Sequence, residues 1–122
     1  RERFEHVWLG VSISDQRTAD DLLPVLEVYR EIVGRLFVSI EPLLGPIRLE
    51  GLEAVDWVIV GGESGPKARR SELSWFRSVR DQCRRADVAF FMKQVPVQGQ
   101  KVAIPYDLHV RWFPPQRAAG GS

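Results

Sequence analysis

Apolar residues along the chain gather into two kinds of segment that alternate. Short runs rich in β-branched and aromatic residues are typical of buried strands, and they occupy residues 7–12, 36–41, 57–60 and 89–92. Longer stretches repeat apolar residues at helical spacing, and they occupy residues 18–33 and 74–86. Two shorter elements are also expected: a helical turn at residues 52–54, and a strand or covering segment within residues 106–113.

Two residues define the expected shape of the first helix. Gly34 follows its last apolar residues, and glycine commonly stands where a helix ends, so we expect the helix to stop there. Pro24 has no amide hydrogen to donate, so we expect it to start a new helical segment or to kink the helix.

The order strand, helix, strand, loop, strand, helix, strand predicts an α/β fold made of parallel βαβ units. We interpret residues 1–113 as half of a (β/α) barrel, with about four parallel strands and flanking helices, and residues 114–122 as a flexible tail. Half a barrel leaves its first and last strands as edges. We therefore expect the chain to associate with itself through these edges, or to fold residues 106–113 back over one of them.

Each predicted strand ends in polar residues, and the carboxyl ends of parallel strands share one edge of a sheet, where ligands bind. The first strand ends in Ser12 and Ser14, the second in Ser39 and Glu41, the third in the turn 61–64, and the fourth in Lys93 and Gln94. Because strand residues alternate between faces, Ser39 and Glu41 share a face. We expect Lys93 to lie near a carboxylate, since an unpaired buried charge is costly. Ordinary strand-to-loop transitions are the alternative interpretation.

The turn Gly61-Gly62-Glu63-Ser64-Gly65 is the strongest local signal. Glycine lets the backbone approach a ligand closely, and free amides in such a turn can hold a phosphate or a carboxylate. The turn matches neither a P-loop nor the dinucleotide-binding GxGxxG pattern. A tight turn with an exposed Glu63 remains the alternative.

Charge and composition narrow the chemistry. The net charge of +1 gives no global support for nucleic acid, and the arginines of residues 77–85 are typical of a solvated helix face. The only cysteine, Cys83, excludes disulfides and CxxC metal sites, and its helical spacing predicts a buried thiol. His6 and His109 are far apart in sequence, so no metal site is expected. No apolar run is long enough to span a bilayer, and we interpret the protein as cytoplasmic.

Several segments together resemble one family, and they cover residues 7–94. The most specific are Glu-Pro-Leu-Leu-Gly-Pro at residues 41–46 and Gly-Gly-Glu-Ser-Gly at residues 61–65. They resemble the phage gene-product-37/gene-product-68 family, uncharacterised radical-SAM-like barrel proteins encoded by phages, prophages and bacteria. The resemblance implies a barrel whose N-terminal half carries a cysteine motif for a [4Fe–4S] cluster, and whose later strands are those seen here.

The resemblance also implies that Ser12, Glu41, Gly61, Gly62, Glu63 and Lys93 face the S-adenosylmethionine and substrate end of the barrel. From this and from the polar strand ends we infer individual roles. The catalytic candidates are Glu41, Glu63 and Lys93, and the cofactor-binding candidates are Ser12, Ser39, Gly61, Gly62 and Ser64. S-adenosylmethionine and the cluster would bind only with the N-terminal half, because this chain has a single cysteine. One departure is Val95-Pro96, where the family continues with Trp-Gly.

We therefore expect this chain to be the C-terminal portion of a radical-SAM-like protein. It would be inactive on its own, and its partner would be the missing half or a second copy. The alternatives are a stand-alone phosphate- or nucleotide-binding module and an inactive prophage remnant. No membrane partner is expected.

Overall fold

The computed structural model describes residues 2–95 and 103–115. Its strands are β1 (Phe4–Ile13), β2 (Val33–Ile40), β3 (Trp57–Gly61) and β4 (Ala89–Gln94). Its helices are α1 (Gln16–Val28) and α2 (Leu73–Ala86), with short 3₁₀ turns η1 (Leu52–Ala54) and η2 (Tyr106–Leu108). Most of the predicted tail lies outside the described residues. None of the described helices is long and apolar enough to cross a membrane.

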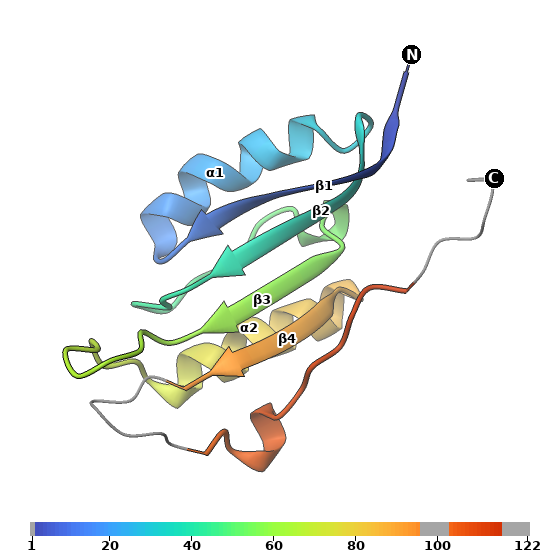
Figure 1. The fold of residues 1–122 in the computed structure, drawn as a ribbon. Coiled ribbons are helices and arrows are strands. Elements are labelled where there is room, and N and C mark those ends of the chain that lie inside the picture. The colour runs from blue at the N-terminus through green and yellow to red at the C-terminus, as the bar shows by residue number, and fades with distance from the viewer. Residues whose placement is uncertain (1, 96–102, 116–122) are drawn as a thin grey trace.

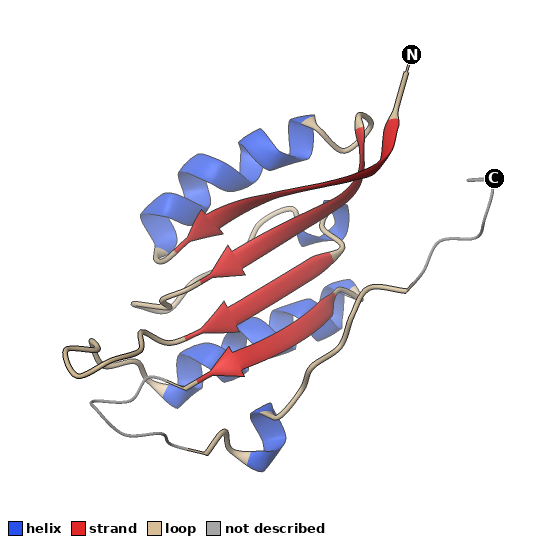
Figure 2. Cartoon of the chain, viewed as in Figure 1, coloured by secondary structure: helices blue, strands red, loops and turns tan. Residues whose placement is uncertain are grey.

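The four strands form one sheet in the order β1-β2-β3-β4, and every neighbouring pair is parallel. All the arrows in Figure 1 therefore point the same way, which confirms the predicted parallel α/β fold with a half-barrel-like arrangement. Both long helices lie behind the sheet in Figure 2, and none of the helices within the described residues covers the front. We call this front the uncovered face.

The core lies between the sheet and the helices. In β2 the side chains of Leu36, Val38 and Ile40 are buried towards the helices, while the residues between them point to the uncovered face and are only half-buried. The helices contribute the buried residues Ala19, Leu23, Leu26, Phe76, Val79 and Cys83. Full burial of a large apolar side chain contributes about 1.5–3 kcal/mol, so these contacts hold the two layers together.

The expected end of the first helix is wrong. The helix ends at Val28, and Gly34 lies inside β2, where a Cβ atom would meet the Glu5 carbonyl oxygen at 1.8 Å. Glycine is needed there because β1 approaches closely, not because a helix ends. Pro24 lies inside this single helix, so of the two outcomes expected for it no new helical segment begins there, and the flanking Leu23 and Leu26 are both buried.

No long helix connects β2 to β3. An extended segment takes its place between α1 and α2, and glutamines from both helices bind its backbone. Gln16 of α1 accepts from the Arg48 amide at 2.7 Å and donates to the Arg48 carbonyl at 3.0 Å. Gln82 of α2 accepts from the Leu49 amide and donates to the Ile47 carbonyl, both at 2.8 Å. The peptide groups of this segment thus find partners without a helix.

Residues 103–115, which we call the strap, run along the outer edge of β4 (Figure 1). The Met92 amide donates to the Val110 carbonyl at 2.8 Å, and the Trp112 amide donates to the Phe90 carbonyl at 3.0 Å. The pairing is antiparallel. This confirms that residues 106–113 fold back over one edge of the sheet, and the edge is that of β4.

Candidate functional site

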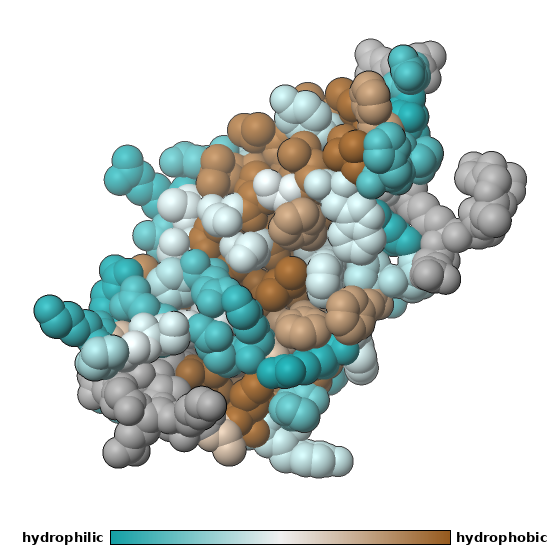
Figure 3. Space-filling view, in the orientation of Figure 1, coloured by the Kyte–Doolittle hydropathy of each residue, from teal (hydrophilic) through white to brown (hydrophobic). Residues whose placement is uncertain are grey.

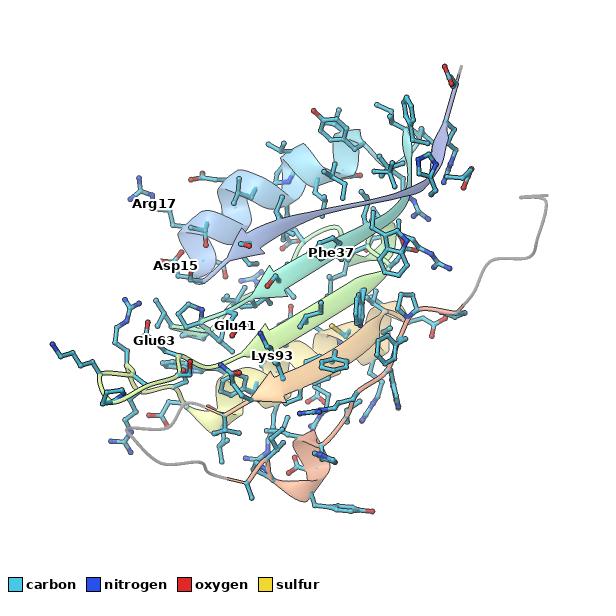
Figure 4. The ribbon with its side chains drawn as sticks, in the orientation of Figure 1. Asp15, Arg17, Phe37, Glu41, Glu63 and Lys93 are labelled. Atoms are coloured by element: carbon cyan, nitrogen blue, oxygen red, sulfur yellow. The ribbon has the colours of Figure 1, made fainter. Side chains whose placement is uncertain are left out.

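The charged pair at the strand ends is formed by Glu41 and Lys93. Lys93 Nζ lies 3.2 Å from Glu41 Oε2 and 3.4 Å from Oε1, across the end of β3. In Figure 4 the two residues stand at the carboxyl ends of β2 and β4, on the uncovered face. The expectation that Lys93 lies near a carboxylate is therefore confirmed. The Lys93 side chain is 53% exposed and that of Glu41 29%, so both remain accessible to a ligand.

Gln94 fixes the position of the carboxylate, and the site prediction from sequence left it out. Its Nε2 donates to Glu41 Oε1 at 3.1 Å and to the Gly62 carbonyl at 2.7 Å. A Cβ atom on Gly61 would come within 3.4 Å of Glu41 Cδ and 3.5 Å of Gln94 Cγ. Both are ordinary van der Waals distances, so Gly61 lies directly against the two side chains without being required there, and a polar residue at the end of the fourth strand was the available signal.

Ser12 and Ser39 lie next to each other on the same face. They are register partners of β1 and β2, and they lie on the side that the helices leave open. Ser12 is exposed and Ser39 half-buried. The structure thus brings both hydroxyls and the Glu41–Lys93 pair onto one face, as the strand pattern predicts.

Aromatic side chains fill the same face towards the amino ends of the strands. The Phe37 ring covers Gly10, where a Cβ atom would lie 2.4 Å from the ring. Trp57 meets Trp8 and Phe91 edge to face, each with 5.9 Å between ring centroids. The face therefore changes from aromatic to polar along the strands. Figure 3 views it directly and shows hydrophobic side chains across its centre, with hydrophilic ones around the margin.

Glu63 lies in the loop after β3, at the same end of the sheet, and its carboxylate pairs with Arg69. Its carboxylate accepts from the Arg69 amide at 2.8 Å and from the guanidinium at 3.0 and 2.7 Å. These hydrogen bonds lower the pKa of Glu63 from 4.5 to about 2. The same contact raises the pKa of Arg69. Glu63 closes the loop after β3, and Ser64 is exposed in that loop.

Part of the glycine turn is already engaged. The Gly62 amide donates to the Gln94 carbonyl at 3.0 Å, and the Gly61 carbonyl accepts from the Leu43 amide at 3.1 Å. Gly65 has a φ of +99°, a conformation that glycine adopts freely. These bonds link the turn to neighbouring strand ends, and the Gly62 amide is not free to hold an anion.

Two arginines of α2, Arg77 and Arg80, contact the strap. Arg77 Nε and Arg80 NH1 bind Asp107 Oδ2 at 2.8 and 2.9 Å, which lowers the pKa of Asp107 to about 2. Cys83 is buried in the same helix, as predicted, and burial raises the pKa of its thiol to about 12. Within residues 2–95 and 103–115, no three His, Cys, Asp or Glu side chains are placed to hold a metal ion.

The fold and this geometry define an α/β protein with a polar cluster at the carboxyl ends of four parallel strands. A family model described as "Protein of unknown function (DUF5131)" matches residues 2–105, and the chain belongs to this family. No curated protein and no solved structure matches the chain significantly.

Proposed function

We propose that this chain supplies the strand-end site of a phage-type, radical-SAM-like barrel protein, and that S-adenosylmethionine binds there. The observation that carries the proposal is the Glu41–Lys93 pair, exposed on the uncovered face where the strands end. The methionine end of S-adenosylmethionine carries an ammonium and a carboxylate, which are complementary to Glu41 and Lys93. Its adenine ring is planar and suits Phe37, which lies on the same face four residues before Glu41.

Within this proposal Lys93 and Glu41 bind and orient charged groups, and Gln94 positions Glu41. The hydroxyls of Ser12 and Ser39 offer donors and acceptors beside them. The Glu63–Arg69 ion pair closes the loop after β3, which borders the site. We therefore assign Glu63 a structural rather than a catalytic role.

The residues of this chain do not fit a [4Fe–4S] cluster. Such clusters are held by several thiolates, and the one cysteine, Cys83, is buried among the core residues of α2. Cluster ligands would have to come from polypeptide outside residues 1–122. We therefore expect the isolated chain to bind ligand without catalysing radical chemistry, and we propose that it acts in the cytoplasm, where a reduced thiol is usual.

The alternative of a phosphate-binding module has less support. It relied on the arginine face of α2 and on free amides of the glycine turn. Arg77 and Arg80 bind Asp107, and the Gly62 amide donates to Gln94.

The test is a titration of the isotope-labelled chain with S-adenosylmethionine, followed through backbone amide shifts. We expect shifts at Ser12, Ser39 and Gly62, and their loss in Glu41→Gln and Lys93→Met. Arg17→Gln makes the same charge change as Lys93→Met at an exposed position of α1, so it is the matched control and should keep the shifts. Unchanged spectra at saturating ligand, or equal shifts in Lys93→Met, would contradict the proposal.

A further inference from the structure

A groove lies on the helix side of the sheet, where the connection from β2 to β3 has no long helix. Residues 46–50 are extended and lie between α1 and α2, and an extended chain is thinner than a helix, which is about 10 Å wide. The space left above them is a groove of about 660 Å³. Sites for small molecules usually measure about 300–1,000 Å³, so the groove has the size of a ligand site. We call it the helix-side groove.

The extended segment turns its charged residues towards the groove. Ile47 and Leu49 are buried in the core, whereas Arg48 and Glu50 are exposed. Alternate residues of an extended chain share a face, so the two charged residues stand on the same side of the segment. Both line the groove.

The two helices form the walls of the groove. Ser78, Gln82 and Arg85 line it from α2 at positions i, i+4 and i+7, and Gln16 and Asp20 line it from α1 at i and i+4. The glutamines are held by the backbone of the extended segment, as described above. Gln16 Nε2 also donates to Asp20 Oδ1 at 2.9 Å, and Gln82 Nε2 donates to Ser78 Oγ at 3.2 Å. Asp20 and Ser78 are therefore oriented, and the Ser78 hydroxyl hydrogen remains available to a ligand.

Four charged side chains line the groove without pairing: Arg48, Arg85, Asp20 and Glu50. Within residues 2–95 and 103–115, neither of these two guanidinium groups has a hydrogen-bond or ion-pair partner. Arginines elsewhere in the chain do bind carboxylates, namely Arg30, Arg35, Arg69, Arg77 and Arg80. The groove thus offers two free cations and two carboxylates that do not neutralise one another directly.

The groove suits a small polar molecule better than a protein. Protein partners are usually held by aromatic and apolar anchors at the centre of the contact. The large hydrophobic side chains that are exposed within the described residues all lie outside the groove.

We infer that the helix-side groove binds a sugar phosphate. Guanidinium groups bind phosphate oxygens through charge-assisted hydrogen bonds, which Arg48 and Arg85 can supply together with the Ser78 hydroxyl. Carboxylates accept hydrogen bonds from the hydroxyls of a ribose, which fits Asp20 and Glu50.

This inference goes beyond the proposed function and does not depend on it. The groove lies on the opposite side of the sheet from the uncovered face. Neither the glycine turn nor the arginines that bind the strap take part in it.

The test is a titration of the isotope-labelled chain with ribose 5-phosphate, followed through backbone amide shifts. We expect shifts at Arg48, Glu50 and Ser78, and none at Ser12 and Ser39 of the strand-end site. Arg48→Gln and Arg85→Gln should each weaken binding by about tenfold or more, because each removes charge-assisted hydrogen bonds to the phosphate. Unshifted groove amides at millimolar ribose 5-phosphate would overturn the inference.

Arg84→Gln is the matched control. Arg84 is the exposed neighbour of Arg85 in α2, and it does not line the groove. The variant makes the same change of charge and should keep the affinity of the unaltered chain. An equal loss of affinity in Arg84→Gln would show that net charge alone attracts the ligand, which would contradict a defined site.

Two further ligands test the role of the sugar. Glu50→Gln should weaken the binding of ribose 5-phosphate but not that of inorganic phosphate, because only the sugar donates to a carboxylate. Equal affinity of the unaltered chain for both would overturn the assignment of a sugar phosphate. Adenosine monophosphate separates the two sources of this chemistry: tighter binding than ribose 5-phosphate assigns a nucleotide, and equal or weaker binding assigns a free sugar phosphate. Either result supports the inference.

Discussion

Replacing Gln94 by leucine should destabilise the protein more than replacing its charged neighbour Lys93 by methionine. Gln94 Nε2 donates to the Gly62 carbonyl and to Glu41 Oε1, and Gly62 is buried. Leucine has a similar size but no donor. The substitution therefore leaves a buried carbonyl without this partner, which costs about 1–3 kcal/mol.

Lys93→Met removes a different kind of contact. The Lys93–Glu41 pair is largely solvated, with side chains 53% and 29% exposed. Exposed ion pairs contribute about 0–1 kcal/mol. We therefore expect a difference in unfolding free energy between the two variants of about 1–2 kcal/mol, with Gln94→Leu the less stable.

Urea unfolding followed by tryptophan fluorescence measures this difference, because both variants keep the four tryptophans of the chain. Ligand affinity should fall more in Lys93→Met than in Gln94→Leu, because Lys93 carries the charge that binds an anionic group. If Lys93→Met unfolds as easily as Gln94→Leu, the assignment of Gln94 as the structural support of the site is wrong.

Three further predictions concern other parts of the molecule. Gly34→Ala should cost about 3 kcal/mol in urea unfolding, since its Cβ would meet the β1 backbone, whereas Gly45→Ala, with no atom within 4 Å, should be neutral or stabilising by about 0.4–1 kcal/mol. Equal changes in unfolding free energy for the two variants would refute the close approach of β1 to Gly34. Because the folded pKa of Glu63 is depressed, its contribution to stability is present above pH 4.5 and is lost as the pH falls towards 2. Carbon-detected NMR should show a carboxyl midpoint near 2 that rises in Arg69→Gln, and an unmoved midpoint would exclude the guanidinium as the cause. Asp107→Asn removes a charge that binds two arginines of α2, so the strap should detach more often. Hydrogen exchange should then accelerate at the Met92 amide of β4 and the Trp112 amide of the strap and stay slow in β2.

The strand order, the parallel direction and the polar strand ends were predictable from sequence. Each depends on a local pattern: an apolar run, a helical period, or a polar residue at a strand end. That Lys93 would lie near a carboxylate was also predictable, because a charge beside a buried strand needs a partner.

What sequence could not supply depends on distances between separate segments. Gly34 has the same local pattern as a helix terminator, and only the approach of Glu5 reveals its role. Glu63 follows β3 as a site residue would, yet it binds Arg69 in its own loop. Gln94 stands one residue past a predicted site position, and its importance arises from the carbonyl of Gly62, just past the end of β3.

The glutamines that bind the segment between the helices also have a consequence for folding. Gln16 belongs to the unit that contains β1 and α1, and Gln82 to the unit that contains β3, α2 and β4. Both bind peptide groups within residues 47–49. If one glutamine lets go, its peptide partners lose their hydrogen bonds while the segment stays attached to the other unit. The two units are thereby coupled, and equilibrium unfolding should proceed as a single cooperative transition.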